Sequence, residues 1–278
     1  MKLVQFVLHI ARSCRLWWSS HRGVVIKTSG SAALGLLSLF TSCRPPSSGS
    51  VTPPAGLVSW WQAEGNAKDT WGTNNGMPLE GATFAPGIVG QAFSFDGTGS
   101  YIRIADSANL HFTNALTIEA WLYIARLGAN QVVVAKWDWT YPDAQKSYTT
   151  WVQPNGRIGF GVCDDGYCPQ GPGGASATVV SANSLPMNQW TYFAATYDGS
   201  GLSIYVNGVC ETQTAYTKGI FPGTGDLRIG AAVLDAVGGM LYPFAGRIDE
   251  LAIYNRALSR AEIRAIYNSG RGGKSARH

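Results

Sequence analysis

The chain has little charge, little histidine and no long apolar run. Only 14% of its 278 residues are charged, against about 25% in a typical globular protein, whereas 45% are hydrophobic. Ordinary hydrophobicity excludes a disordered chain, because such chains lack apolar surface to bury. No stretch reaches the ~18 to 20 consecutive apolar residues that a membrane-spanning helix needs. A globular chain of this length forms one large domain or two small ones.

The net charge of +4 is unevenly distributed along the sequence. Residues 1–50 contain six basic side chains and no acidic one, and residues 271–278 form a basic tail with three more. The 220 residues in between contain 12 basic and 17 acidic side chains. Proteins that bind nucleic acid neutralise phosphates with a basic patch, whereas the middle of this chain is acidic. The sequence therefore predicts no nucleic-acid partner.

Residues 1–43 have the features of an export leader. An apolar run at 32–42 has the length of a signal-peptide core, and Cys43 follows it directly. The arrangement resembles a bacterial lipoprotein signal, in which this cysteine is lipidated; the alternative is a signal that is cleaved without lipidation. Both predict an exported protein of the cell envelope or the extracellular space. Membrane contact is expected only through a lipid on Cys43, and residues 44–55 are expected to form a Pro/Ser-rich linker.

From Gly56 onward the hydrophobic pattern has the period of β-strands. Residues 116–123 alternate Leu, Ile, Ala and Leu with Thr, Glu, Trp and Tyr, which predicts a half-buried strand. Further short strands are expected at Gln131–Trp137, Ser147–Val152 and Arg157–Val162. Asn155-Gly156 predicts a type I′ turn between the last two, since this pair tolerates two positive φ angles.

A three-stranded meander is predicted near residue 200. Strands at Trp190–Tyr197 and Leu202–Val206 are joined by a turn at 198–201, and Asn207-Gly208 turns the chain into Val209–Thr212. These tight connections require antiparallel neighbours.

One short helix is expected, at Ser259–Asn268. Ser259 and Glu262 have the spacing of a capping box, and Gly270 can end the helix. No repeat of 20–50 residues is visible, which disfavours propellers and solenoids. The sequence therefore predicts an all-β protein, a two-sheet antiparallel sandwich or jelly roll with one short C-terminal helix.

Six segments of the chain follow one another in the order and spacing of a known β-domain. They are GLVSWWQAEGNAKDTWGTNNG (56–76), GIVGQAFSFDGTGSYIRI (87–104), LTIEAWLYI (116–124), NQWTYFAATYDGSGLSIYVNGV (188–209), LRIGA (227–231) and FAGRIDELAIYNRALSRAEI (244–263). Together they resemble laminin-G-like, concanavalin A-like jelly-roll domains. The resemblance implies one domain over residues 56–270, a concave face that often binds glycans, and commonly a calcium ion. Members include lectins, adhesion modules, pentraxins and glycosidase accessory domains, so the fold does not fix the function.

The resemblance also suggests where calcium would bind. In such domains the ion often lies where the N-terminal segment meets the last long strand, and it takes oxygen ligands. Candidate ligands are Glu64, Asp69 and Asn75 in a Gly/Asn-rich loop, and Asp249 near the C-terminal end. The alternative for the loop residues is turn formation, because Asp and Asn side chains accept hydrogen bonds from nearby backbone. Asp249, on an expected core strand, is harder to explain in that way.

Glycan binding requires exposed aromatic rings beside polar groups, because a sugar stacks its C–H face on a ring. Segment 136–143 offers Trp137, Asp138, Trp139, Tyr141 and Asp143 as candidates. Tyr167 and the loop Leu234–Tyr242 are further candidates. The alternative for Trp137 and Trp139 is burial in the core, as for most tryptophans.

The sequence contains few of the residue combinations that known catalytic sites use. The domain has one histidine, His111, which is expected to be a packed loop residue, so Ser-His-Asp triads and multi-histidine zinc sites lack components. A retaining glycosidase needs two carboxylates about 5 Å apart. The E-x-D-x-E strand motif of related glucanases is absent, and Glu119 and Glu250 could meet only through the tertiary fold. We therefore expect no enzyme activity.

Three cysteines remain beyond the leader. Cys163 and Cys168 flank a four-residue turn that would bring them together, and an exported compartment permits a disulfide. The alternative is two reduced thiols. The distance between the two Cα atoms determines whether a disulfide can form, and the sequence does not give that distance. Cys210 is expected to stay unpaired.

The sequence as a whole favours an exported, non-catalytic carbohydrate-binding or adhesion module that depends on calcium. Its expected partner is a glycan or a cell-surface or extracellular protein. A structural protein–protein module of the cell envelope is the second hypothesis. A divergent polysaccharide hydrolase or lyase is the third.

Overall fold

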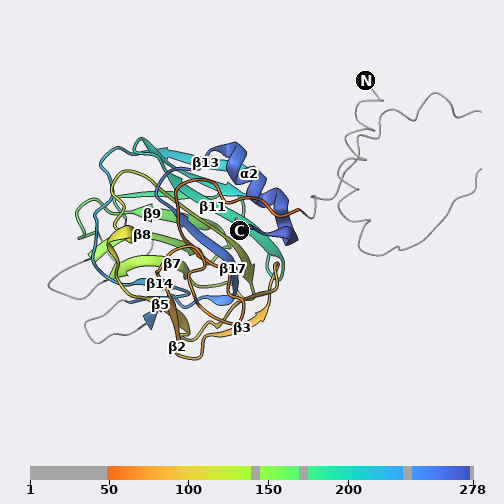
Figure 1. Ribbon diagram of the computed structural model, residues 1–278. Coiled ribbons are helices and arrows are strands. Elements are labelled where there is room, and N and C mark those ends of the chain that lie inside the picture. The colour runs from red at the N-terminus through yellow and green to blue at the C-terminus, as the bar shows by residue number, and fades with distance from the viewer. Residues whose placement is uncertain (1–48, 139–144, 169–174, 234–239, 276–278) are drawn as a thin grey trace, which may run out of the picture. The chain divides into compact units, whose positions relative to one another are not determined.

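The computed structural model describes residues 49–138, 145–168, 175–233 and 240–275. Within these ranges, two antiparallel sheets pack face to face, and one α-helix follows the last strand (Figure 1). This confirms the predicted antiparallel β-sandwich with a single short C-terminal helix. Among the described residues, no helix combines the length and apolarity needed to cross a membrane.

The larger sheet has eight strands. Their order is β13-β12-β11-β6-β17-β4-β3, and β1 pairs with the second half of β17. The strands are β1 (Leu57–Trp61), β3 (Thr83–Pro86), β4 (Gln91–Asp96), β6 (Leu116–Ile124), β11 (Trp190–Tyr197), β12 (Gly201–Val206), β13 (Val209–Ala215) and β17 (Ala245–Tyr254). The predicted meander is therefore confirmed as β11, β12 and β13.

The smaller sheet has seven strands in the order β10-β9-β8-β7-β14-β5-β2. They are β2 (Gly76–Leu79), β5 (Tyr101–Ile104), β7 (Gln131–Asp138), β8 (Gln145–Val152), β9 (Ile158–Val162), β10 (Ala177–Val180) and β14 (Leu227–Ile229). A two-stranded hairpin consists of β15 (Ala232–Val233) and β16 (Met240–Leu241). The remaining elements are the helix α2 (Arg260–Ser269) and the 3-10 turns η1 (Ala108–Leu110) and η2 (Gly270–Gly272).

The main hydrophobic core lies between the two sheets. Leu116, Ile118 and Leu122 of β6 point into it and are fully buried. Phe160 of β9, in the other sheet, belongs to the same core. Each such side chain contributes about 1.5–3 kcal/mol to stability when it leaves water, so the alternating pattern fixes which face of each strand points inward.

The outer face of the eight-stranded sheet is buried as well, which corrects the prediction that residues 116–123 form a half-buried strand. Glu119 is 0% exposed and Trp121 is 7% exposed. Ile263 and Ile266 of α2 join Trp121 in a second apolar cluster on this face, and Figure 1 shows α2 beside β11 and β13. The alternation along the strand was real, but a helix distant in sequence covers the polar side.

Helix α2 begins with the predicted capping box. The Glu262 N–H donates to Ser259 Oγ at 3.3 Å, and the Ser259 N–H donates to the Glu262 carboxylate at 2.8 Å. Arg256 also donates to this carboxylate, at 3.0 and 2.5 Å. Hydrogen bonds from Arg256 and then Ser259 lower the pKa of Glu262 to about 2. The helix start is thus fixed by local chemistry.

The two Asn-Gly turns differ. Asn207 and Gly208 have φ angles of 50° and 76°, as the predicted type I′ turn requires. At the other turn only Gly156 has a positive φ, 84°, so the prediction of a type I′ turn at Asn155-Gly156 is wrong. The Asn155 side chain instead accepts a hydrogen bond from the Arg157 N–H at 3.1 Å. The preceding Pro154 presets a negative φ, which favours an ordinary turn.

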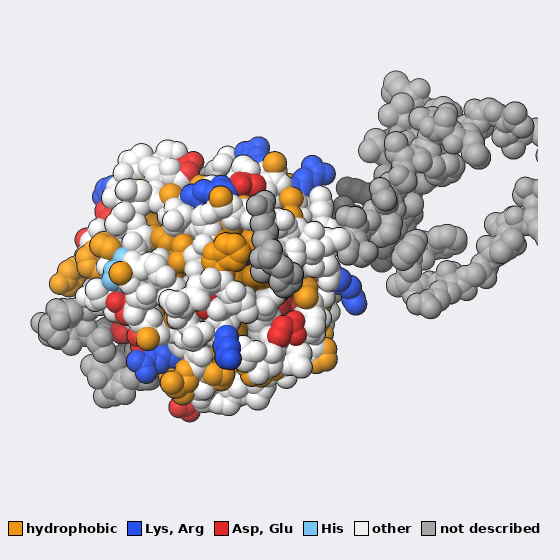
Figure 2. All heavy atoms as spheres, viewed as in Figure 1, with side chains coloured by type: hydrophobic (Ala, Val, Ile, Leu, Met, Phe, Trp, Pro, Cys, Tyr) orange, Lys and Arg blue, Asp and Glu red, His pale blue; other side chains and the backbone are white. Residues whose placement is uncertain are grey.

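Charged side chains are sparse on the face drawn in Figure 2, and basic and acidic ones are interspersed. Most of that face is uncharged. This appearance agrees with the low charged fraction of the sequence.

Candidate functional site

Two of the four predicted calcium ligands, Asp69 and Asn75, organise the loop between β1 and β2. Asp69 Oδ2 accepts a hydrogen bond from the Asn74 N–H at 3.1 Å, and Asn75 Oδ1 accepts one from the Asp69 N–H at 3.0 Å. Asp69 Oδ1 accepts from three further backbone N–H groups at 2.9–3.0 Å, those of Trp60, Trp71 and Gly72. Both carboxylate oxygens of Asp69 therefore accept backbone hydrogen bonds that a cation would have to displace. This is the turn-forming role given above as the alternative to calcium binding.

The other two, Glu64 and Asp249, flank the turn that connects β3 to β4. Glu64 Oε2 accepts from the Gln91 N–H at 3.1 Å, and Asp249 Oδ2 accepts from the N–H groups of Ile88 and Val89 at 2.8 and 3.0 Å. Asp249 is fully buried, and its Oδ1 finds no partner among the described residues. Burial raises the pKa of Asp249 to about 8, so this carboxyl is largely protonated at neutral pH.

The four residues form two separate pairs. Within the part of the chain that the structure describes, the oxygens of Glu64, Asp69 and Asp249 do not all approach within 4.8 Å of one another. Calcium takes six to eight oxygen ligands, and both carboxylate oxygens of Asp69 already accept backbone hydrogen bonds. These residues do not supply one common set of ligands, and calcium binding stays a prediction.

The predicted glycan-binding aromatics that the structure describes have opposite exposures. Trp137 is 3% exposed because it packs with Trp151 in an apolar cluster on the seven-stranded sheet, so it offers no open platform. Tyr167 is 67% exposed. Asp138 lies 3.6 Å from Arg228 Nη2 as an ion pair. The other three candidates, Trp139, Tyr141 and Asp143, lie outside the described residues.

The disulfide between Cys163 and Cys168 forms as predicted, with a Cα–Cα distance of 5.8 Å. It closes the loop that carries Tyr167, whose N–H also donates to Asp165 Oδ1 at 2.8 Å. Cys210 is free and half-buried, as expected. The bridge therefore holds an exposed tyrosine on a constrained loop.

His111 and the two glutamates considered for catalysis have structural partners. His111 Nε2 lies 2.8 Å from Asp106 Oδ1, on a surface loop. Glu119 and Glu250 do come together, because both lie within 3.4 Å of Lys274 Nζ. They are 0% and 2% exposed, however, which keeps a polysaccharide out of reach.

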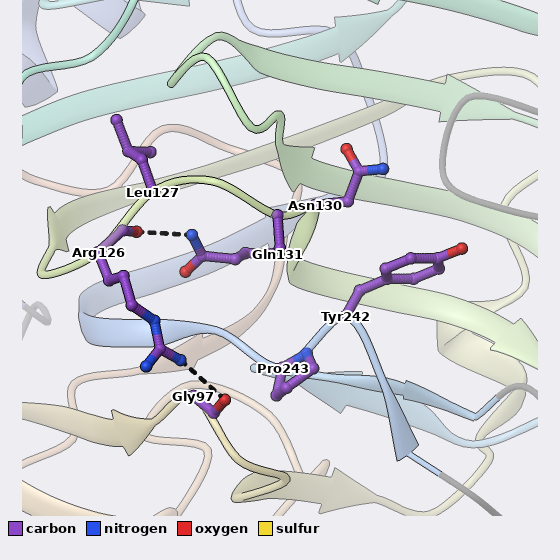
Figure 3. Close-up of a pocket in the computed structure, with 8 residues that line it drawn as sticks. Gly97, Arg126, Leu127, Asn130, Gln131, Tyr242 and Pro243 are labelled. Carbon is purple, nitrogen blue, oxygen red and sulfur yellow. Dashed lines mark hydrogen bonds between the residues drawn. The ribbon is translucent and has the colours of Figure 1, made fainter.

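A small pocket lies at the rim of the sandwich, where the β6–β7 loop meets the turn after β4 and the segment before β17 (Figure 3). Its volume is about 160 Å³. The residues that line it are Gly97, Arg126, Leu127, Ala129, Asn130, Gln131, Tyr242 and Pro243. The pocket thus combines the aromatic ring of Tyr242, the pyrrolidine ring of Pro243, one guanidinium group and two side-chain amides.

The walls of this pocket are held by hydrogen bonds. The buried Gln131 donates to the Arg126 carbonyl at 2.7 Å and accepts from the Ala245 N–H at 2.8 Å. Arg126 Nη2 donates to the Gly97 carbonyl at 3.1 Å, and Figure 3 shows Arg126 across the pocket from Tyr242. The remaining guanidinium donors have no hydrogen-bond partner among the described residues.

Tyr242 has a φ of 56°, which is rare for a bulky residue. Its carbonyl accepts a hydrogen bond from the Val132 N–H at 2.7 Å, which helps to hold this conformation. Strained backbone of this kind gathers at ligand sites, because the surrounding structure must be built to maintain it. The strain therefore marks Tyr242 as the most informative residue of the rim pocket.

Sequence reasoning found this pocket only in part. Tyr242 ends the loop Leu234–Tyr242, which was a secondary candidate. Arg126 and Asn130 were missed because their loop carries no motif, and Gln131 was expected only as the first residue of a strand. The positive φ of Tyr242, one of six non-glycine residues with this property among those described, is visible only in the structure.

The comparisons with known proteins agree on the fold. The family model of the concanavalin A-like lectin/glucanases superfamily matches residues 96–264, more than half of the chain. A search of curated proteins found no match.

Several solved structures of low sequence identity share the architecture. Domain 4 of AbnA, a GH43 extracellular arabinanase from Geobacillus stearothermophilus in complex with arabinotriose, is 20% identical; the match covers 75% of this chain and 96% of that one, with a TM-score of 0.57. The binding domain of Paraclostridial Mosquitocidal Protein 1 is 16% identical, with 77% and 52% covered and a TM-score of 0.60. A Trypanosoma rangeli sialidase mutant displaying trans-sialidase activity is 17% identical, with 82% and 35% covered and a TM-score of 0.58.

The chain thus spans about half of the toxin binding domain and about a third of the sialidase. Identities this low show the fold alone, and that fold is shared by binding domains and glycosidases. Together with the two antiparallel sheets described above, the family match leads to one conclusion. The chain belongs to the concanavalin A-like lectin/glucanase superfamily.

Proposed function

We propose that this protein is a non-catalytic carbohydrate-binding module and that the rim pocket receives one sugar unit of a glycan. The observation that carries the proposal is the strained Tyr242, held opposite Arg126 in a hollow that the amides of Asn130 and Gln131 also line. A sugar presents an apolar C–H face, which suits an aromatic ring, and hydroxyl groups, which suit amide and guanidinium donors.

The size of the pocket sets the size of the ligand. Its volume of about 160 Å³ is below the roughly 300 Å³ at which pockets for drug-sized ligands begin. One sugar ring fits this volume, whereas a stretch of polysaccharide does not. We therefore expect recognition of a chain end or a side branch.

The absence of a carboxylate from the pocket wall supports a binding role. None of the eight lining residues is Asp, Glu or His. Glycoside hydrolysis uses a pair of carboxylates beside the scissile bond. Glu119 and Glu250 are near one another, but they are enclosed on another face of the sandwich. Binding without hydrolysis is the simplest function for this pocket.

Export of the protein is part of the proposal. A disulfide between Cys163 and Cys168 suits an oxidising compartment. Incorporation of labelled palmitate into the wild-type chain, and not into a Cys43→Ser variant, would support a lipid anchor. An unlabelled wild-type chain in the periplasm or medium would favour a cleaved signal.

Glycan binding is tested by applying the full chain to a glycan array, with and without EDTA. Arabino-oligosaccharides are a sensible first probe, because domain 4 of AbnA was solved with arabinotriose. We expect Tyr242→Ala to lose at least tenfold in affinity and Tyr101→Ala, a half-buried tyrosine of β5 that does not line the pocket, to retain it. Binding that EDTA abolishes would support the calcium prediction.

Two results would contradict the proposal. One is the absence of binding to every glycan, with or without added calcium. The other is equal affinity in the wild type and the Tyr242→Ala variant, which would remove the rim pocket from the site. Hydrolysis of a bound glycan would instead favour the enzyme hypothesis.

A further inference from the structure

A buried cluster of charges lies beneath the C-terminal segment and includes Glu119 and Glu250, the two glutamates considered above for catalysis. The Lys274 side chain is 1% exposed. Its Nζ donates to Glu119 Oε1 at 2.9 Å and to the Glu250 carbonyl at 3.0 Å, and it lies 3.4 Å from Glu250 Oε2. One ammonium group therefore contacts carboxylates from two neighbouring strands, β6 and β17, and burial raises the pKa of the Glu119 carboxyl.

The surroundings of Lys274 are polar and aromatic. Its Nζ lies 5.1 Å from the centroid of the Trp60 ring, a cation–π contact. Trp60 Nε1 and the Tyr254 hydroxyl are buried without a partner among the described residues. Burial alone would lower the pKa of Lys274, but Glu119 and Glu250 raise it, so the lysine stays charged. If this ammonium group left, two carboxylates would remain buried without a counter-charge.

The backbone around Lys274 holds the start of the described chain. The Val51 N–H donates to the Gly273 carbonyl at 3.0 Å, and the Ser275 N–H donates to the Val51 carbonyl at 2.9 Å. Val51 and Lys274 are thus paired in a parallel bridge. A Cβ on Gly272 would come within 2.8 Å of the Gly49 backbone, so only glycine allows this close approach. The two ends of the described domain are fastened to each other at one point.

The segment itself has little that would hold it in place without Lys274. It begins where α2 ends, and it contains three glycines, at positions 270, 272 and 273. Glycine loses more conformational entropy on ordering than any other residue. Its docking therefore depends on the lysine side chain, since the two backbone hydrogen bonds with Val51 and the longer one from the Lys274 N–H to Glu250 Oε2, at 3.5 Å, contribute only about 1 kcal/mol each.

We propose that Gly270–Ser275 is a C-terminal clasp: by inserting Lys274 between Glu119 and Glu250, it fastens Val51, the entry point of the N-terminal segment, onto the eight-stranded sheet. The clasp can open and close without unfolding of the two sheets. Opening it frees both ends of the domain together and leaves the sandwich folded. The pairing couples the opening of residues 270–275 to the release of Val51.

Hydrogen exchange of the full chain, read at single amides, tests the clasp with the variant Lys274→Met. We expect the Val51 and Ser275 amides to lose protection together, by about a hundredfold or more, because breaking one side of a buried ion cluster is strongly unfavourable. The Phe193 amide in β11 should remain protected. An exposed lysine, Lys68, provides the matched control as Lys68→Met, which should match the wild type.

A charge-neutral variant, Glu119→Gln with Glu250→Gln and Lys274→Met, separates charge from packing and also covers the case in which the single variant does not fold. It should recover protection at Val51, because no carboxylate is left without a partner. The clasp is refuted if Val51 stays protected in Lys274→Met, or if Phe193 loses protection along with it. It is also refuted if the charge-neutral variant folds and leaves Val51 as exposed to exchange as Lys274→Met does.

Discussion

Two cations of this protein, Lys274 and Arg126, have opposite environments. Lys274 is enclosed by Glu119 and Glu250 on the face that α2 covers, and its side chain is 1% exposed. Arg126 is exposed on the rim pocket and donates to one carbonyl, that of Gly97. Among the described residues it has no acidic partner within ion-pair distance.

This contrast separates stability from binding. A buried charge must be paired within the protein, because its loss of hydration costs several kcal/mol. An exposed guanidinium with spare donors pays no such cost and can offer them to a ligand. Substitutions on the covered face should therefore lower the free energy of unfolding, whereas substitutions at the rim pocket should lower affinity and leave stability unchanged.

The largest effect is expected on the covered face, at Ile263. Its side chain is 0% exposed and attaches α2 to the sheet. Ile263→Ala should lower the free energy of unfolding by about 2–5 kcal/mol, through lost burial and the cavity left behind. Urea unfolding measures this loss, and Arg264→Ala, an exposed neighbour on the same helix, should change it by less than about 0.5 kcal/mol. Similar values for both variants would mean that α2 is not anchored through this face.

The next effect is expected at the disulfide, on the other sheet. Replacing Cys163 and Cys168 together by serine should lower the free energy of unfolding by about 2 kcal/mol, because a short closed loop restricts the unfolded chain modestly. Urea unfolding without reductant gives the value. Cys210→Ser serves as control, since this thiol forms no bridge. A double variant as stable as the wild type would show that the bridge constrains only its own loop.

The sequence could predict features that depend on neighbouring residues, but not features that depend on the tertiary fold. Alternating strands, the turn at Asn207-Gly208 and the cap at Ser259 depend on neighbouring residues, so their pattern was sufficient. The partners of Lys274 lie 155 and 24 residues away, and the basic composition of residues 271–278 gave no sign that their one lysine is buried. Only the tertiary fold brings these charges together.

The candidate site was harder to predict than the fold for a related reason. Trp137 stands in an aromatic-rich segment, yet it is covered, because a cluster that includes Trp151, Cys163 and Ala232 packs beside it. Residues of three distant segments decide its exposure. The positive φ of Tyr242 likewise depends on the tertiary fold, and no local sequence pattern predicts it.

A smaller effect, on affinity alone, is expected at Arg126. If the rim pocket binds a sugar as proposed, Arg126→Gln should weaken binding by about tenfold, close to the ~1.4 kcal/mol of one hydrogen bond from a charged donor. Isothermal titration with the best glycan from the array measures this change, and thermal unfolding of the same variant should match the wild type. Arg157→Gln is the control, an arginine outside the pocket. A large loss of stability in Arg126→Gln would contradict the expectation that Arg126, unlike Lys274, contributes to binding and not to stability.

The smallest effect concerns the pH dependence at the start of α2. The pKa of Glu262 is about 2 in the folded protein, below its ordinary value of 4.5, because Arg256 and Ser259 hydrogen-bond to the ionised form. Its contribution to stability is therefore complete above about pH 4.5 and is lost as the pH falls toward 2. Since the pair is partly exposed, Glu262→Gln should cost only about 1 kcal/mol at pH 7. Urea unfolding of both proteins at pH 7, 4 and 2 should show this gap narrowing as the pH falls, because at pH 2 the Glu262 carboxyl is protonated in the unfolded chain and about half protonated in the folded protein. A gap that stays constant with pH would assign the cost to lost packing of α2, and the start of the helix would then resemble the apolar Ile263 contact more than an ionic one.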